Sequence, residues 1–521
     1  MRLADSRRLF GANLMSDGPA ALVDVELDAG EDARAAIESW QREVEAVLPG
    51  ARTVTRRYAG GATMLIEGEL DQILALCDVA EHAVAPDPAR RDELRALVEA
   101  ARDPRLRALA AAAAARDLPL LVDDELVSIG LGRRSSSFPR GELPDGVDGV
   151  PWERLGRIPV ALVTGTNGKT TSARLAGSMA LEAYISVGVA TTDAITVRGE
   201  TVAAGDYTGP DAARQVLRHP EVDLAVLETA RGGILRRGLA FDQHDAALIT
   251  NVSDDHLGRY GIDDVASMAR VKATVGRTVR PEGTVVLNRD DPHLARLRFP
   301  ARVVGFSTTK PADWCLDDGW LVGGGERLAR VEELPLAFGG AAAYNVANAL
   351  GAAALADALG VAREAIVTAL KSFGQDDNPG RGNVIDAGGV RVILDFAHNP
   401  EGVRAFLELA RSLGGKLHVV AAQPGDRRDD AIAAVAREIA RVGPARVVLH
   451  DLAGYLRGRA PGEVPAMLRR ELERRHVPVE EAPAEAAALA KAIAGAQPGD
   501  VVVLFPLLDP VGCHAVLRQD G

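Results

Sequence analysis

Cysteine is scarce in this chain, and the only three cysteines are Cys77, Cys315 and Cys513. None of them lies in a CxxC pair, so the sequence predicts neither a disulfide framework nor a cysteine-ligated zinc site. A protein without disulfides suits a reducing compartment, and we therefore expect it in the cytoplasm.

Long apolar runs and an excess of basic charge are also missing. The N-terminal residues MRLADSRRLFGANL contain no apolar segment of the kind that marks a secretory signal. The longest run of one residue, Ala110–Ala115, is too short to span a bilayer. The formal net charge is −13, whereas nucleic-acid binders usually carry a basic face. We expect no membrane segment and no nucleic-acid partner, and the sequence leaves a homo-oligomer open.

The length and composition indicate a globular protein of several domains. At 521 residues and 47% hydrophobic content, the chain accommodates about three domains of roughly 150 residues each. Residues 1–118 combine strand-like alternation in AALVDVEL and TMLIEGEL with the helical pattern ARAAIESWQREVEAVL. This mixture predicts a small α+β domain. Residues 119–158 are rich in glycine, proline and serine, and they are predicted to be a linker.

Two units of alternating strands and helices follow. Residues 159–381 and 382–521 both contain short β-rich apolar runs separated by helical segments, which is typical of buried parallel strands joined by crossover helices. We therefore predict an α/β protein of three domains: the small N-terminal domain, a central P-loop ATPase domain on a parallel sheet, and a C-terminal Rossmann-like domain. The runs are VALVTG, DLAVLET, AALITNVS, GTVVLN and ARVVGFS in the central unit, and VRVILDFA, KLHVVAAQ, ARVVLHD and DVVVLFP in the last.

The segment PVALVTGTNGKTTSARL, residues 159–175, has the character of a phosphate-binding loop. Its glycines let consecutive backbone N–H groups turn toward phosphates, and the following helix presents its positive N-terminus. Lys169 would then reach the β- and γ-phosphate oxygens of a nucleotide, and the Thr170 hydroxyl would bind Mg²⁺. The strict motif has glycine where Val163 stands, so the loop is a variant. Alone it leaves open whether the last phosphate goes to water, to a hydroxyl or to a carboxylate.

Three further residues are candidates for a metal site. Glu228 ends the apolar run in VLETAR, at the carboxyl edge where α/β sheets bind ligands, and it could hold Mg²⁺ opposite the phosphate loop. His256 in NVSDDHLGRYG is a candidate for a second metal, although a lone histidine is more often structural. Lys272 lies in the helical pattern DVASMARVKATVGRTV, where a surface lysine would be the ordinary interpretation.

Seven segments that occur in order resemble the ATP-dependent Mur ligase superfamily: GTNGKTT, LETARGGIL, NVSDDHLG, ARVK, YNVANALGA, NPGRGNV and DFAHNP. GDYTGP and LETARGGILRRGLAFD are most similar to the Mur-like ligase half of the cyanophycin synthetases, over about residues 159–521. Weaker similarity in RRLFGANL and ALVDVEL extends to the N-terminal domain of that branch. The ATP-grasp module that the branch also carries has no counterpart here, because the linker is too short to contain one.

The resemblance implies roles for individual residues, with ATP and Mg²⁺ as cofactors. Lys272 matches a lysine that is carbamylated in many Mur ligases; a carbamate offers Mg²⁺ an oxygen ligand, whereas an ammonium would repel it. The implied catalytic residues are Lys169, Glu228, His256 and Lys272. The implied metal ligands are Thr170, Glu228, His256 and carbamylated Lys272. The implied ATP contacts are Gly165, Thr166, Asn167, Gly168, Lys169, Thr170, Thr171, Asn345, Asn348, Arg381 and Asp395.

The same resemblance implies a substrate site on the C-terminal domain. His398 and Asn399 of DFAHNP and Asp426 and Arg427 of QPGDRRDD match residues near the nucleotide or the incoming substrate, although a charged solvated loop also explains the last pair. Gly382 stands where relatives usually have an aromatic residue, so the adenine or hinge packing is expected to be looser.

The function implied is an acid–amino acid ligase that forms an amide through an acyl phosphate and releases ADP. The cyanophycin-like branch suggests an aspartate or peptide side-chain carboxylate as the acid and an amino acid such as arginine as the amine. Two alternatives stay open: the same chemistry on another substrate, such as γ-glutamyl extension, or an ATP-binding regulatory protein without ligase activity.

Overall fold

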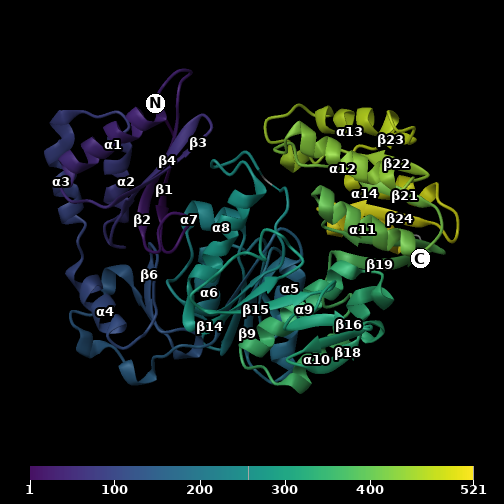
Figure 1. The fold of residues 1–521 in the computed structure, drawn as a ribbon, viewed down its shortest axis with the longest axis horizontal. Helices are drawn as coiled ribbons and strands as arrows, with labels where there is room; N and C mark the ends of the chain where they lie inside the picture. The colour runs from purple at the N-terminus through teal and green to yellow at the C-terminus, as the bar shows by residue number, and fades with distance from the viewer. Residues whose placement is uncertain (256, 520–521) are drawn as a thin grey trace.

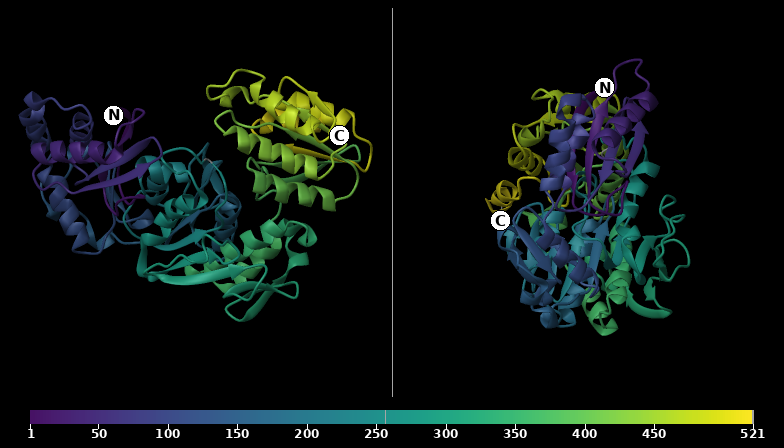
Figure 2. Two further views of the ribbon diagram at one scale, coloured as in Figure 1. Left: turned by 45° about the horizontal axis from the view of Figure 1, so that its top comes forward. Right: turned by 90° about the vertical axis from the view of Figure 1, so that its left-hand side faces the viewer.

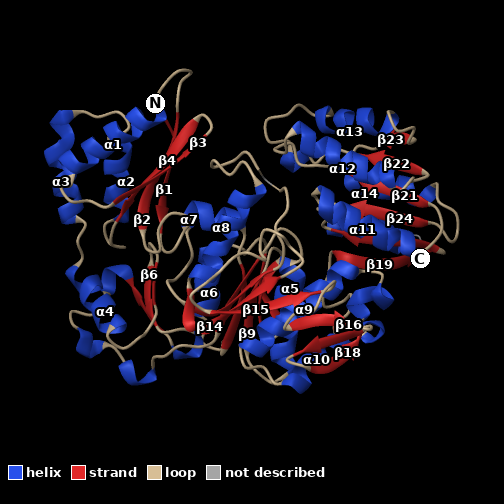
Figure 3. Cartoon of the chain, in the orientation of Figure 1, coloured by secondary structure: helices blue, strands red, loops and turns tan. Residues whose placement is uncertain are grey.

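The computed structural model describes residues 1–255 and 257–519, which form four β-sheets. Figure 1 shows the N-terminal part in purple and the C-terminal part in yellow on opposite sides of a teal and green central body, and the turned view at the left of Figure 2 keeps this order. Helices flank the larger sheets (Figure 3), which confirms the predicted α/β class.

The N-terminal unit is an antiparallel sheet of order β1-β2-β4-β3 covered by helices. Trp40 of α1 is fully buried against this sheet and donates its Nε1 hydrogen to the Ala80 carbonyl at 2.9 Å. The predicted small α+β unit is therefore organised around a single aromatic anchor and its apolar neighbours. Its elements are β1 (Arg2–Leu9), β2 (Ala20–Glu26), α1 (Ala33–Val47), β3 (Thr53–Tyr58), β4 (Gly61–Glu67), α2 (Ile73–His82) and α3 (Arg91–Ala100).

The segment predicted to be a linker is folded. It contains a three-stranded antiparallel sheet of β5 (Leu120–Val122), β6 (Leu126–Ile129) and β7 (Ser136–Pro139), against which α4 (Pro104–Ala114) packs. The side chains of Val127 and Ile129 are fully buried in this small core. Glycine and proline therefore mark the turns between short strands here, and the N-terminal and central units are joined by a compact connection.

The central unit contains an eleven-stranded sheet of order β11-β10-β9-β12-β8-β13-β14-β15-β16-β17-β18. The strands from β9 to β16 in this order run parallel, whereas both edges are finished by antiparallel strands that the sequence patterns had not predicted. Its strands are β8 (Val160–Thr164), β9 (Val187–Ala190), β10 (Ala194–Val197), β11 (Glu200–Ala204), β12 (Leu224–Glu228), β13 (His244–Ile249), β14 (Val279–Asn288), β15 (Arg302–Ser307), β16 (Trp314–Asp317), β17 (Trp320–Gly323) and β18 (Glu326–Arg330).

Both faces of the central sheet are covered, which explains its uninterrupted apolar runs. In β8, Ala161 and Val163 join a core with the helices on one face, while Val160 and Leu162 join the core on the other. The first face carries α5 (Lys169–Glu182), α9 (Ala343–Ala358) and α10 (Arg363–Ser372). The second carries α6 (Pro210–Leu217), α7 (Arg231–Arg237) and α8 (Val265–Arg277).

The C-terminal unit is a six-stranded sheet of order β19-β20-β24-β21-β22-β23, parallel except for β19. One face packs against α11, α12 and α13, and the other against α14 and α15. Its elements are β19 (Arg381–Ala387), β20 (Val390–Asp395), α11 (Pro400–Ser412), β21 (Leu417–Ala421), α12 (Asp429–Arg441), β22 (Arg446–Leu449), α13 (Glu463–Glu473), β23 (Val479–Glu481), α14 (Glu485–Ala494), β24 (Val501–Phe505) and α15 (Pro510–Gln519).

Within residues 1–255 and 257–519, no helix combines the length and the apolar character that crossing a membrane requires.

Candidate active site

The phosphate loop joins β8 to the N-terminus of α5 in the middle of the central sheet. Gly165 and Gly168 both have positive φ angles, +155° and +82°, and a Cβ on Gly165 would overlap the Thr250 hydroxyl. Asn251, at the end of neighbouring β13, fixes the loop: its side-chain oxygen accepts the Asn167 N–H at 2.9 Å, and its carbonyl accepts the Thr166 N–H at 2.8 Å. The loop is therefore held by the strand beside it as well as by its own glycines.

Gly168 also contacts α9, the helix that carries Asn345 and Asn348, the two asparagines predicted to contact ATP. A Cβ on Gly168 would overlap the Oδ1 atom of Asn348. The Asn348 amide donates to Asn345 Oδ1 at 3.1 Å, and the Asn345 amide donates to the Leu336 carbonyl at 3.0 Å. Both asparagines are buried, and together they form a chain of amides that sets the distance between α9 and the phosphate loop.

This contact makes Gly168→Ala informative. A left-handed backbone costs an L-residue about 1–2 kcal/mol, and the new methyl group must displace Asn348. We expect ATP affinity to fall about tenfold or more, since about 1.4 kcal/mol is a factor of ten. Titration calorimetry with ATP measures it. Gly141→Ala is the matched control, because Gly141 is exposed and a Cβ there has no neighbour within 4 Å. Equal affinities of the two variants would contradict the prediction.

Glu228 and Thr170 meet beside the loop, as the sequence predicted for a cation site. The Thr170 hydroxyl donates to Glu228 Oε2 at 2.9 Å. The Thr192 hydroxyl donates to Glu228 Oε1 at 2.9 Å, and the Thr192 N–H donates to Oε2 at 3.0 Å. Glu228 is only 2% exposed. A buried carboxylate and a hydroxyl at the start of α5 are hard oxygen donors, which is the donor set that Mg²⁺ prefers.

Lys272 is buried in α8 behind the phosphate loop, not on the surface. Its Nζ atom donates to the Gly165 carbonyl at 2.6 Å, and the residue is 4% exposed. Burial lowers the pKa of its amine well below the usual value, and nearby Lys169 lowers it further, while Asp255 and Glu228 oppose the shift. The ammonium form is therefore disfavoured here relative to a lysine exposed to water.

His256, the predicted second-metal ligand, lies outside the described residues. Among residues 1–255 and 257–519 there is no group of three or more histidine, cysteine, aspartate or glutamate side chains placed to hold a metal ion. A cation site at this position would therefore be formed by Thr170 and Glu228.

The C-terminal unit supplies the opposite wall through the segment between β20 and α11. Asn399 caps α11 by accepting the Gly402 N–H at 2.9 Å, and its amide donates to Asn167 Oδ1 of the phosphate loop at 2.8 Å. Asp395 is half-buried, and desolvation raises the pKa of its carboxyl to about 6 despite the opposing effect of Arg381. Residues far apart in the chain thus meet across the domain boundary.

Arg381 is the first residue of β19, where the chain passes from the central unit into the C-terminal unit. It forms an ion pair with Asp193 at 3.2 Å, and its guanidinium lies 4.7 Å from the centre of the Phe396 ring. Arg174 of α5 pairs with the same Asp193 at 2.6 Å. Two arginines from different units therefore share one carboxylate, which lies directly after Thr192.

Gly382 is the position where an aromatic residue was expected from the resemblance. A Cβ on Gly382 would lie 3.3 Å from the Tyr344 hydroxyl, so Tyr344 already occupies the adjoining space. Burial raises the pKa of the Tyr344 phenol well above its usual value. The aromatic surface at this place is therefore supplied by Tyr344 and Phe396, which lie in YNVANALGA and DFAHNP but had no predicted role.

These groups enclose a cavity of about 200 Å³ between the two units. Of the predicted residues, eleven line it: Thr166, Asn167, Gly168, Lys169, Thr170, Thr171, Glu228, Asn348, Arg381, Asp395 and His398. Gly165, Asn345 and Lys272 lie outside this lining. Sequence reasoning missed Thr192, Asn251, Tyr344, Phe396 and Glu401. Asn251 lies near the carboxyl end of the predicted run AALITNVS, so the rule that identified Glu228 could have found it.

A second, smaller pocket of about 20 Å³ contains the predicted substrate residues. His398, Asn399, Asp426 and Arg427 line it together with Asp254 and Asp255. Arg427 is 8% exposed and pairs with Asp255 at 2.9 Å, and Arg259 pairs with Asp426 at 3.3 Å. Asp426 and Arg427 are therefore not part of a solvated loop, because they contact the segment that precedes α8, whereas Arg428, Asp429 and Asp430 are exposed.

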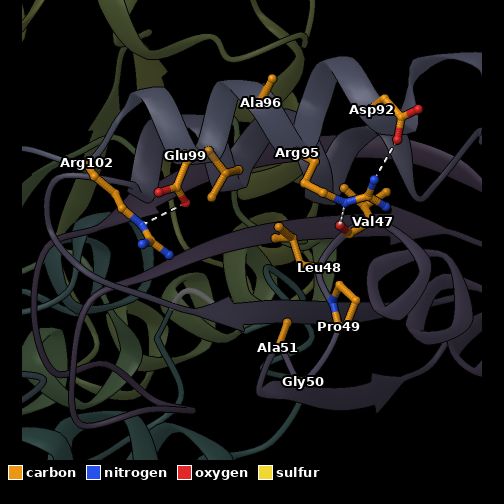
Figure 4. A pocket seen from close by; sticks show the side chains of 11 residues that line it. Val47, Leu48, Pro49, Gly50, Ala51, Asp92, Arg95, Ala96, Glu99 and Arg102 are labelled. Carbon is orange, nitrogen blue, oxygen red and sulfur yellow. Dashed lines mark hydrogen bonds and ion pairs between the residues drawn. The ribbon is translucent and has the colours of Figure 1, made fainter.

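A larger hollow, about 650 Å³, lies on the N-terminal unit between the end of α1 and α3 (Figure 4). Its charged residues are occupied with one another and with the backbone: Arg95 pairs with Asp92 at 2.6 Å and donates to the Val47 carbonyl at 3.1 Å. Arg102 pairs with Glu99 at 3.1 Å. No set of polar groups among its lining residues converges as the groups around the phosphate loop do.

Comparisons with known families identify the class of protein that this fold and site define. The Mur ligase middle domain matches residues 163–356, and the Mur ligase glutamate ligase domain matches residues 380–507. The chain belongs to the Mur ligase family, and the resemblance predicted from its motifs is confirmed.

Individual relatives place it within that family. Cyanophycin synthetase from Synechocystis sp. is 37% identical over 67% of this chain and 42% of the relative, so the chain spans about two-fifths of the length of that protein. UDP-N-acetylmuramoylalanine–D-glutamate ligase from Aromatoleum aromaticum is 30% identical over 67% of this chain and 68% of the relative. A folylpolyglutamate synthase/dihydrofolate synthase from Yersinia pestis, solved with AMPPNP and Mn, shares the fold at a TM-score of 0.50 and 20% identity, over 69% of this chain and 88% of that one.

Proposed function

We propose that this protein is an ADP-forming, ATP-dependent ligase that joins an amine to a carboxylic acid through an acyl phosphate. The observation that carries the proposal is that the phosphate loop, Glu228 and the segment Asp395–His398 face one cavity from two different units. A nucleotide held by the loop would meet its acceptor there, between walls that can exclude water. Membership of the Mur ligase family supports this reaction class.

We propose ATP as the nucleotide substrate of this cavity. Its phosphates would lie on the N–H groups of residues 166–170 and the N-terminus of α5, with the Lys169 ammonium on the β- and γ-oxygens. The base would lie on the side of Asn348, Tyr344 and Phe396, where the lining is aromatic.

The reaction then depends mainly on charged groups around the phosphates and on the positions in which the substrates are held. The acid's carboxylate oxygen attacks the γ-phosphorus in line and forms the acyl phosphate, with ADP as the leaving group. The neutral amine attacks the acyl carbon, phosphate leaves, and the amide forms as the amine loses its proton. Lys169 neutralises charge on the transferred phosphoryl group, and Arg381 can add a rigid fork of donors when it leaves Asp193. Closure of the C-terminal unit excludes the water that would hydrolyse the acyl phosphate.

Thr170 and Glu228 would hold Mg²⁺, since their oxygens lie 2.9 Å apart at the edge of the phosphate loop. Charge neutralisation on the phosphate oxygens is what a bound Mg²⁺ would supply. The folylpolyglutamate synthase structure contains an Mn ion together with its nucleotide analogue, which supports a divalent cation in this fold.

For the substrates, we propose an aspartate or peptide side-chain carboxylate as the acid and an amino acid such as arginine as the amine. Similarity to cyanophycin synthetase supports this pair. The carboxylates of Asp254, Asp255 and Asp426 gather in the second pocket beside His398, and an arginine substrate would have to displace Arg428, Arg427 or Arg259 from them. Carboxylates are the partners that a guanidinium binds through two parallel hydrogen bonds.

A matrix of acids crossed with amines tests the proposal. Free aspartate, aspartyl peptides, glutamate and γ-glutamyl peptides are each combined with arginine, lysine, glutamate or no amine. Phosphate release from ATP and amide masses are then recorded. The proposal predicts at least one pair that raises release above the background and yields the amide. Release that ignores every acid and amine would instead fit an ATP-binding regulatory protein, and a product only with γ-glutamyl acids would fit γ-glutamyl extension.

Lys272 is proposed to act as a carbamate. Its buried amine, whose pKa is lowered well below the usual value by desolvation, lies 2.6 Å from the Gly165 carbonyl, where an ammonium would oppose a cation held by Glu228 and Thr170. We expect Lys272→Ala to reduce turnover about 10²-fold, the size of a lost electrostatic contact, and millimolar acetate or formate to restore part of it. Lys310→Ala, at an exposed lysine of the same unit, should respond to neither. Loss without any rescue, together with no carbamate mass on Lys272, would contradict the carbamate.

A further inference from the structure

The N-terminal unit reaches the loop that leads from β13 into α8. Arg56 of β3 donates to the Gly261 carbonyl at 2.7 Å and also to the Tyr260 carbonyl. Gly261 has a positive φ angle of +62°, and a Cβ there would overlap the Tyr58 ring. The guanidinium of Arg7 lies 4.7 Å from the centre of the Tyr260 ring. Arg56 of β3 therefore holds the backbone carbonyls of Tyr260 and Gly261, and Arg7 of β1 contacts the Tyr260 ring.

The same loop is held from the other side by the C-terminal unit. Arg259 pairs with Asp426 at 3.3 Å, next to the residues that Arg56 binds. Asp255 pairs with Arg427 at 2.9 Å, and Asp254 lies 3.7 Å from Arg428. In Figure 1 the loop that enters α8 rises between β3 of the N-terminal unit and α12 of the C-terminal unit. The pocket that His398 lines with Asp254 and Asp255 is thus formed in part by the loop between β13 and α8. The other end of this loop contacts β3.

We propose that Arg56 is a positioning residue for the ligase reaction: it fixes the loop of Asp254, Asp255 and Arg259, so that residues 426–428 dock on a preformed surface when the cleft closes. The inference rests on the proposed function. A two-point anchor matters because a shift of about 1 Å at reacting groups can cost about 10²-fold in rate. The N-terminal unit is then part of the catalytic apparatus and not only an attachment.

Arg56 and Arg57 offer a matched pair for the test. They are neighbours in β3, where successive side chains point to opposite faces, and Arg57 is exposed. We expect Arg56→Gln to lower kcat for amide formation about tenfold or more, while the Kd for a non-hydrolysable ATP analogue stays within about twofold. Arg57→Gln should match wild type. Arg56→Lys should recover part of the activity, because it keeps the charge but loses the two-pronged contact.

Hydrogen exchange gives a readout that does not depend on catalysis. Peptides within residues 257–263 should exchange faster in Arg56→Gln than in Arg57→Gln, while those of the phosphate loop should not change. If Arg56→Gln does not fold, Gly261→Ala perturbs the same contact from the loop and should show the same loss of kcat and the same local exchange. An Arg56→Gln protein with the kcat and loop exchange of Arg57→Gln would overturn the inference. If wild type forms no amide, the proposed function fails, and unchanged loop exchange in Arg56→Gln still overturns the anchoring on its own.

Discussion

Lys169→Ala is expected to abolish amide formation, with a loss of at least about 10³-fold in kcat. Lys169 begins α5 and lines the nucleotide cavity, and its Nζ atom donates to the Thr166 carbonyl at 3.0 Å. In the proposed reaction its charge meets the negative charge that spreads over the transferred phosphoryl oxygens. Preorganised charges of this kind contribute about 10²–10⁵-fold in phosphoryl and acyl transfer. Phosphate release and product mass with the best substrate pair measure the loss.

The matched control for Lys169 is Lys310→Ala, an exposed lysine of the same unit. It should retain wild-type turnover, and both variants should unfold at wild-type temperature, since neither deletion opens an apolar cavity. Substantial turnover by Lys169→Ala would remove the phosphate loop from the mechanism.

Glu228→Gln should lower turnover by about 10²-fold or more and raise the Mg²⁺ concentration needed for half-maximal rate. The amide keeps the size of the carboxylate but removes its charge, and charge is what a hard cation requires from its ligands. The amide nitrogen also cannot accept from the Thr170 or Thr192 hydroxyl, each of which donates to Glu228 at 2.9 Å. A titration of Mg²⁺ at saturating ATP separates the loss of affinity for the cation from the loss of kcat.

Glu221→Gln is the control for this titration. Glu221 is exposed just before β12, and its pair with Arg198 at 3.4 Å lies at the surface, where ion pairs contribute little. Its Mg²⁺ dependence should equal that of wild type. If Glu228→Gln shows the same Mg²⁺ dependence as Glu221→Gln, then Glu228 is not a cation ligand.

The parallel strands of this protein were predictable because burial on both faces leaves a direct trace in the sequence. The runs around Val160, Leu224, Ala246, Val392 and Val501 contain almost no polar residue, and each forms a strand of a parallel ladder. The edge strands leave no such trace. Residues of β11 are largely exposed, so packing imposes no pattern on them, and their pairing depends on the neighbouring strand.

The site was predictable only as far as its residues lie in local motifs. The phosphate loop, Glu228 and DFAHNP could each be identified from their own segment. Thr192 and Asp193 could not, because they follow β9, a four-residue strand that no pattern marked. Tyr344 and Phe396 lie within YNVANALGA and DFAHNP, but their part in the cavity wall follows only from the way the two units meet. The contact of Arg56 with Tyr260 joins residues 204 positions apart, and no periodicity encodes it.

The destination of the γ-phosphate is tested most directly by running the reaction in H₂¹⁸O with the acid and amine pair that gives most product. If a carboxylate attacks the γ-phosphorus, the fourth oxygen of the released phosphate comes from the acid, so the phosphate carries no ¹⁸O and appears in step with the amide. If water attacks that phosphorus, each phosphate carries one ¹⁸O atom and no amide accompanies it. The ligase account predicts the unlabelled phosphate, and phosphate that is labelled throughout would contradict it.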